Sequence, residues 1–160
     1  MDKALVVQEI IKKLETDLEV LVTSAKAAHD AATHEESKAE DKYDTRGLEA
    51  SYLAGAQSKR AAEIQAMITE YRRADLGTFT ARTPIAVTAL VEVEGEGKRS
   101  WYFLTGKGGG DSVKVGGHSI HVISVHSPVG AELVGRTVGE EFEVRLASGQ
   151  RRDLEIVDVS

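Results

Sequence analysis

Six carboxylates lie close together in the segment HEESKAEDKYDTRGLEASY, residues 34–52. Carboxylates are hard oxygen ligands that suit Mg²⁺, an ion that takes one or two of them and fills its other positions with water and phosphate oxygens. A flexible acidic segment would not hold Mg²⁺ tightly by itself, but it would complete a half-formed site in another protein. There a second metal would serve phosphodiester hydrolysis by stabilising the attacking water and the leaving oxygen. The six residues are Glu35, Glu36, Glu40, Asp41, Asp44 and Glu49.

A simpler interpretation of these acids is solubility and helix capping. Thr33 and Glu36 have the spacing of a capping box, and Asp44 is placed to cap a helix that follows it. Exposed turns are usually polar for the same reasons. The residues alone leave both interpretations open.

Two long amphipathic segments flank the acidic residues. Before them, apolar residues recur at alternating steps of four and three, which is the a/d pattern of a coiled coil; a weaker stripe with a polar middle follows them. We predict an antiparallel helical hairpin with arms of roughly 33 residues, each about 50 Å long, and a tip near residues 35–49. A dimeric coiled coil and part of a bundle are the alternatives. The first stripe is Val7, Ile11, Leu14, Leu18, Leu21, Ala25, Ala28 and Ala32, and the second is Ala50, Leu53, Gln57, Arg60, Ile64, Met67, Tyr71 and Ala74.

The composition changes after residue 75, because only Gly47 and Gly55 of the 15 glycines, and neither of the two prolines, precede that point. We therefore predict two domains, the hairpin over 1–75 and a globular domain over 76–160. Ser127 is placed to cap a helix of about two turns that begins at Pro128 and ends at Gly135. One short helix against an antiparallel sheet gives a compact α+β domain. The predicted strands are 86–95, 99–106, 118–125, 140–146 and 151–159.

The overall composition and charge of the chain exclude several classes of function. The net charge is −6 with a pI near 5.4, which argues against non-specific binding to the phosphate backbone of nucleic acids. The chain has no cysteine, so disulfides, cysteine-ligated zinc and thiol catalysis are excluded. Neither a signal peptide nor an apolar run long enough to cross a membrane is recognisable, and we expect a cytoplasmic protein.

Three other features of the second half are expected to be structural. His118 and His121 have an odd spacing, which places their rings on opposite faces of a strand and makes them a poor metal pair. Adjacent Trp101 and Tyr102 are expected on opposite faces for the same reason. The segment GKGGGD, residues 106–111, lacks the Lys-Ser/Thr ending of a phosphate-binding loop, and we predict a flexible connection there.

The end of the chain, ISVHSPVGAELVGRTVGEEFEVRLASGQRRDLEIVDV, closely resembles the C-terminal end of the bacterial Gre transcript-cleavage factors. The shared pattern is a Ser-Pro followed by an apolar residue, then Leu-apolar-Gly-Lys/Arg, then Gly-acidic. Here it falls on Ser127 to Val129, Leu133 to Arg136, and Gly139-Glu140. The order of the Gre family is a coiled-coil hairpin, a linker and an FKBP-like domain, so the resemblance covers the whole chain.

The resemblance implies an accessory factor of bacterial RNA polymerase with no enzymatic activity of its own. In the family, the globular domain docks at the rim of the secondary channel and the finger enters it. Acidic residues at the tip help to hold a Mg²⁺ of the polymerase active site, which then cleaves the 3′ end of backtracked RNA. We expect a monomer that binds no cofactor alone and makes no membrane contact. The implied polymerase-binding residues are His126, Ser127, Pro128 and Val129, and the implied catalytic residues are Asp44 and Glu49, which would share the Mg²⁺, together with Asp41 and Glu40.

The tip departs from the family pattern Gly-Asp-apolar-x-Glu-Asn-Ala-Glu-Tyr. Counted back from Tyr52, the acidic positions of that pattern fall on Thr45 and Leu48, whereas Asp44 and Glu49 flank them. Displacements on the order of 1 Å matter in a catalytic site. The alternative is therefore a channel-binding regulator that does not stimulate cleavage. A third hypothesis, from another class, is a peptidyl-prolyl isomerase or chaperone activity of the FKBP-like domain.

Overall fold

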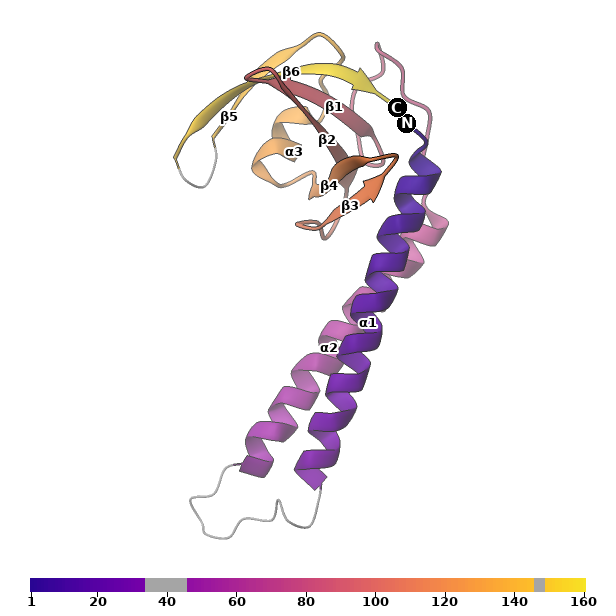
Figure 1. Cartoon of the computed structure of the whole chain (residues 1–160), viewed down its shortest axis with the longest axis vertical. Coiled ribbons are helices and arrows are strands. Elements are labelled where there is room, and N and C mark those ends of the chain that lie inside the picture. Colours follow the sequence, from indigo (N-terminus) through magenta and orange to yellow (C-terminus); the bar gives the residue numbers. More distant parts are fainter. Residues whose placement is uncertain (34–45, 146–148) are drawn as a thin grey trace. The chain divides into compact units, whose positions relative to one another are not determined.

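The computed structural model describes residues 1–33, 46–145 and 149–160. Contacts divide the chain into two compact units. One, the hairpin unit, comprises residues 11–72, and the other, the globular unit, comprises residues 1–10 and 73–160 (Figure 1). In chain order the elements are α1 (Lys3–Thr33), α2 (Arg46–Arg73), β1 (Leu90–Gly95), β2 (Lys98–Thr105), β3 (Ser112–Val115), β4 (His118–Ser124), α3 (Pro128–Leu133), β5 (Glu141–Arg145) and β6 (Arg151–Val159).

The hairpin unit consists of the main parts of α1 and α2, which run side by side (Figure 1). Along α1, the predicted seam is confirmed, since Leu14 is buried and Leu18, Leu21, Ala25 and Ala28 are half-buried. Residues 22–24 and 26–27 between these positions are exposed. An ion pair links the two helices, with Arg72 Nη2 2.5 Å from Glu15 Oε1. The predicted helical hairpin is therefore confirmed.

The predicted seam of α2 is wrong at Leu53 and Arg60, whereas Gln57 is half-buried as predicted. Leu53 is 53% exposed, and the neighbouring Ala54 is only 8% exposed. Likewise Arg60 is exposed and Ala61 is half-buried, so at these two positions the seam lies one residue later than predicted. Ala54 and Ala61 line the same surface hollow as Ala25 of α1, which shows that alanines of both helices face each other. Small side chains let the two helices approach closely. For this reason alanines occupy the seam, and the more apolar Leu53 does not mark it.

The globular unit contains one six-stranded sheet with the order β3-β4-β2-β1-β6-β5. The predicted sheet with a single short helix is confirmed, with two differences. The sheet is mixed, because β2 and β4 pair in parallel while the other neighbours pair antiparallel. A further four-residue strand, β3, directly follows the glycine-rich connection and pairs with β4. It is too short to show a periodic pattern in the sequence.

The first strand begins at Leu90, not at residue 86. The preceding residues form a turn in which Thr88 has a φ of +74°. The hairpin turn between β1 and β2 contains Glu96 and Gly97, which both have positive φ values, 53° and 70°. Two successive positive φ values are typical of the tight turns that match the twist of paired strands.

Apolar side chains are buried on both faces of the sheet. A cluster that includes Val91, Leu104 and Ile156 packs with Leu133 of α3, and Tyr102 lies against this cluster. Trp101 is buried and alternates with Tyr102 along β2, so their expected placement on opposite faces is confirmed. The two histidines follow the same alternation. The ring of His118 lies 6.1 Å from that of Trp101, and the ring of His121 lies 5.5 Å from that of Tyr102.

Burial raises the pKa of the Tyr102 phenol, and a hydrogen bond with Ser100 and the charge of Arg152 oppose this only in part. The folded protein therefore holds this proton at a higher pH than the unfolded chain does. The resulting stability is fully present below the ordinary pKa of about 10 and is lost as pH rises through the folded pKa.

We expect Tyr102→Phe to remove this alkaline loss of stability and to remove a phenol whose ionisation is displaced to higher pH in a titration of phenolate absorbance. Tyr52→Phe, which removes a 72% exposed phenol, is the control. A titration in which the two variants lose the same portion of the absorbance curve would contradict the prediction.

Candidate functional site

The turn that precedes α3 is built around Ser127. Its hydroxyl donates to the carbonyl oxygen of Ser124 at 2.7 Å and accepts a hydrogen bond from the amide of Gly130 at 3.1 Å. Ser127 is extended, with φ −71° and ψ 159°, and Pro128 begins the helix. The predicted cap and proline start are therefore confirmed. Capping satisfies an amide that would otherwise lack a partner in the first turn.

Contacts at both ends fix α3 against the sheet. At its start, Gly130 is buried so close to the Ser124 carbonyl that no side chain fits. At its end, Leu133 is fully buried, and the carbonyl of Arg136 accepts a hydrogen bond from the amide of Ile85 at 2.8 Å. The Arg136 guanidinium also pairs with Glu132 at 2.8 Å. The helix is therefore a rigid support for whatever side chains it exposes.

Part of the outer side of this segment is apolar, and the partly exposed Glu132, paired with Arg136, lies beside that part. Pro128, Ala131 and Val134 are exposed at steps of three residues, and His126 is exposed just before the helix. Val134 is 45% exposed, which is high for a valine beside a core. Residues three apart on a helix are surface neighbours. We call His126, Pro128, Ala131 and Val134 the α3 surface.

The structure separates the four residues that the resemblance assigned to polymerase binding. His126 and Pro128 are exposed on the α3 surface. Ser127 is half-buried and caps the helix, while Val129 is half-buried and packs against the core. Ala131 and Val134 were missed by sequence reasoning. Two features of the sequence could have identified Ala131 and Val134. They follow Pro128 at helical spacing, and Leu133 between them is the apolar residue that would point into the core.

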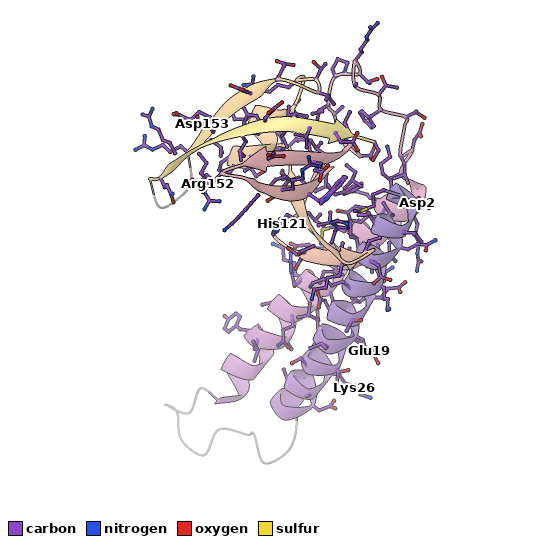
Figure 2. The ribbon with its side chains drawn as sticks, turned by 45° about the horizontal axis from the view of Figure 1, so that its top comes forward. Asp2, Glu19, Lys26, His121, Arg152 and Asp153 are labelled. Carbon is purple, nitrogen blue, oxygen red and sulfur yellow. The ribbon has the colours of Figure 1, made fainter. Side chains whose placement is uncertain are left out.

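A second candidate is a cavity of about 160 Å³ between the end of the β1–β2 hairpin, strand β6 and α3. Its apolar floor includes Tyr102 and Val129. Arg152 and Asp153, labelled in Figure 2, contribute charged groups to its lining. Small-molecule sites are mostly apolar and aromatic. Because Tyr102 is the one aromatic residue among those that line this cavity, it gives no specific support to the isomerase hypothesis.

Three of the four predicted catalytic residues, Glu40, Asp41 and Asp44, lie outside the described residues, as do the proposed capping residues Glu36 and Asp44. Glu49 is the fourth residue of α2, and only its backbone is described. In the described parts of the chain, no group of three or more histidines and acids is arranged to hold a metal ion. A search of those same parts found no helix that is long and apolar enough to span a membrane.

Comparisons with known proteins point to one family. Residues 83–160 match the family model described as transcription elongation factor, GreA/GreB, C-terminal. This match includes the whole α3 surface and confirms the resemblance to the Gre family over the globular domain. The comparison with curated protein sequences found no match.

The chain is also similar to several solved structures. The GreA factor homologue Gfh1 of Thermus thermophilus has 24% identity, coverage of 94% of both chains and a TM-score of 0.39. Gfh1 of Thermus aquaticus has 24% identity, coverage of 95% of this chain and 92% of that one, and a TM-score of 0.38. An elongation factor GreA/GreB of Nitrosomonas europaea has 22% identity, coverage of 61% and 78%, and a TM-score of 0.36.

Proposed function

We propose that this chain, whose residues 83–160 match the GreA/GreB C-terminal family model, is a transcription elongation factor that binds bacterial RNA polymerase. The family match over residues 83–160 is the observation that carries the proposal. In this proposal the globular domain docks on the polymerase, and the hairpin enters the secondary channel. The factor then stimulates the Mg²⁺-dependent cleavage of backtracked RNA by the polymerase.

The α3 surface is the part of the globular domain best suited to dock. Pro128, Ala131 and Val134 are apolar and α3 is held at both ends, with the Glu132–Arg136 pair beside them. The centres of protein interfaces are depleted of charged residues, and charges are more common at their rims. A rigid patch also loses little conformational freedom on binding. We propose Pro128, Ala131 and Val134 as the contact residues, with His126 at the edge of the contact. Ser127 and Val129 support this surface from behind through the cap and the core.

In this proposal, the hairpin gives the factor its length, and the acidic residues of segment 34–52 give it negative charge. Helix α1 has 31 residues, which corresponds to a length of about 45 Å. In the proposed mechanism, Asp44 and Glu49, with Asp41 and Glu40, help the polymerase hold a second Mg²⁺ next to the RNA 3′ end. The metal would stabilise the attacking water and the leaving oxygen, and the polymerase would perform the hydrolysis. The chain itself would then be an accessory factor and not an enzyme.

The second candidate function is regulation of the channel without cleavage. The observation in its favour is the position of the acids in the sequence, because Asp44 and Glu49 flank the two positions at which the Gre pattern has its acids. A finger that enters the channel but misplaces its carboxylates would block or modulate the polymerase. Both functions require polymerase binding, and only the first requires Mg²⁺-dependent shortening of RNA.

Binding to the polymerase is measured with purified bacterial core enzyme and the full chain carrying a fluorescent label. We expect saturable binding, with competition by unlabelled protein. The isomerase hypothesis predicts instead turnover of a prolyl peptide without polymerase. The proposal fails if the labelled chain shows no saturable binding to core enzyme while an authentic Gre factor binds under the same conditions.

A further inference from the structure

Two acids and two bases line the cavity of about 160 Å³ in the globular unit. They are Glu96 and Lys98 at the β1–β2 hairpin, and Arg152 and Asp153 of β6, which Figure 2 labels. Within residues 1–33, 46–145 and 149–160, none of the four forms an ion pair. Each of the two segments therefore offers one acid and one base, and these charges do not pair across the cavity.

Neighbouring arginines on the same strands do form ion pairs. Arg99, next to Lys98, lies 3.0 Å from a glutamate of β1, and Arg151, next to Arg152, lies 3.1 Å from a glutamate of β5. The lack of pairs is thus particular to the residues that line the cavity. Charges that have no partner in the protein are available to a charged ligand, and hydrogen bonds between charged groups are roughly twice as strong as neutral ones.

The floor of the cavity between these charges is apolar. Val129 of α3, Val144 of β5 and Leu154 of β6 contribute to it, together with the ring of Tyr102. The phenol of Tyr102 forms a hydrogen bond with Ser100, another lining residue. Ligand sites typically combine such an apolar lining with a small number of polar groups. A ligand that fits this lining has an apolar body next to charges of both signs.

Gly95 fixes the part of the floor between β1 and β6. A β-carbon at this position would overlap the Leu154 side chain and lie 3.0 Å from the carbonyl oxygen of Asp153. Strand β6 therefore packs directly onto the backbone of Gly95, and the cavity is formed before any ligand binds. A preformed site loses little conformational freedom on binding.

We propose that this cavity binds a free α-amino acid with an apolar side chain. Lys98 and Arg152 bind the carboxylate of the ligand. Glu96 and Asp153 face its ammonium group, and its side chain lies against Tyr102. The cavity volume of about 160 Å³ agrees with a ligand of this size, since pockets for drug-sized molecules measure roughly 300–1,000 Å³. The site is independent of the proposed function and belongs to the globular unit alone.

Ligands that lack one of the two charges test the proposal. The full chain, labelled with ¹⁵N, is titrated with L-leucine, with leucinamide, which lacks the carboxylate, and with N-acetylleucine, which lacks the ammonium group. We expect leucine to shift the amide signals of Gly95 and Tyr102 until they saturate. Each derivative should bind at least about tenfold more weakly, the loss expected for hydrogen bonds to a charged group.

The same titrations distinguish a free amino acid from the end of a peptide. Leucinamide resembles the first residue of a peptide and N-acetylleucine the last, and each carries only one of the two charges. Equal binding of either derivative and leucine would assign the cavity to a peptide end and overturn the proposal. The absence of saturable shifts with leucine, valine and phenylalanine would overturn it as well.

Arg152→Gln tests which residue holds the carboxylate. We expect this variant to bind leucine about tenfold more weakly and to bind leucinamide as the wild type does, because leucinamide has no carboxylate to lose. Arg151→Gln, which removes the adjacent, ion-paired guanidinium, is the matched control and should change leucine binding by less than about twofold. The assignment fails if both variants weaken leucine binding equally, or if Arg152→Gln weakens leucinamide binding as much as leucine binding.

Discussion

Val134→Glu is expected to weaken binding to bacterial RNA polymerase by about 30-fold, the effect of losing roughly 2 kcal/mol at a central interface position. The side chain is 45% exposed in the free protein, so the glutamate stays in water there and the fold is retained. On docking, the carboxylate would be transferred into an apolar contact without a partner, which is costly. The measurement is the dissociation constant for core polymerase, together with the unfolding midpoint of the free variant.

The control for this prediction adds the same charge elsewhere on the globular unit. Ser119→Glu changes an exposed residue of β4 and should leave the affinity within about twofold, since isolated surface charges have small effects. Equal weakening in both variants would point to a general effect of net charge. Full affinity of Val134→Glu would remove the α3 surface from the docking site.

Gly130→Ala is expected to lower the free energy of unfolding of the globular unit by about 3 kcal/mol, near the upper end of the usual cost of overpacking. A β-carbon at this position would overlap the Ser124 carbonyl oxygen and lie 2.9 Å from the Ser127 hydroxyl. Both neighbours belong to the cap that starts α3, so the substitution strains the cap and the helix together. The measurement is denaturant unfolding followed by the fluorescence of Trp101, the one tryptophan of the chain.

Gly106→Ala is the matched control for the glycine prediction. Its added β-carbon would meet only the Val87 side chain at 4.0 Å, an ordinary contact distance. We expect this variant to unfold within about 1 kcal/mol of the wild type. If Gly130→Ala is as stable as Gly106→Ala, α3 moves more easily than its contacts indicate, and it is not the rigid support that the docking proposal needs.

The features that sequence reasoning found were those with a strong local cause. The seam of α1 is visible because large apolar residues such as Leu14 and Leu21 recur at heptad steps over several turns. The start of α3 is visible because Ser127 and Pro128 have narrow conformational preferences that suit a helix N-terminus. The alternation of Trp101 and Tyr102 follows directly from the geometry of a strand.

The features that sequence reasoning missed depend on contacts between residues that are far apart in the sequence. Ala54 and Ala61 lie in the α2 seam because alanines let the helices approach, whereas the more apolar Leu53 remains exposed. Thr88 delays the start of the expected strand to Leu90 through a backbone conformation that no propensity indicates for threonine. The exposed Val134 looks like a core residue in the sequence, and only its position after the buried Leu133 reveals a surface.

The central claim concerns RNA cleavage, and a stalled, backtracked elongation complex with 3′-extended RNA and Mg²⁺ tests it most directly. We predict that the wild-type chain accelerates shortening of the RNA by at least about tenfold, the lower end of the effects that groups supporting a metal site have on activity. The double variant Asp44→Ala/Glu49→Ala should bind the polymerase equally and give no acceleration. RNA that stays intact with bound wild-type protein would contradict the claim and leave the chain as a regulator of the channel.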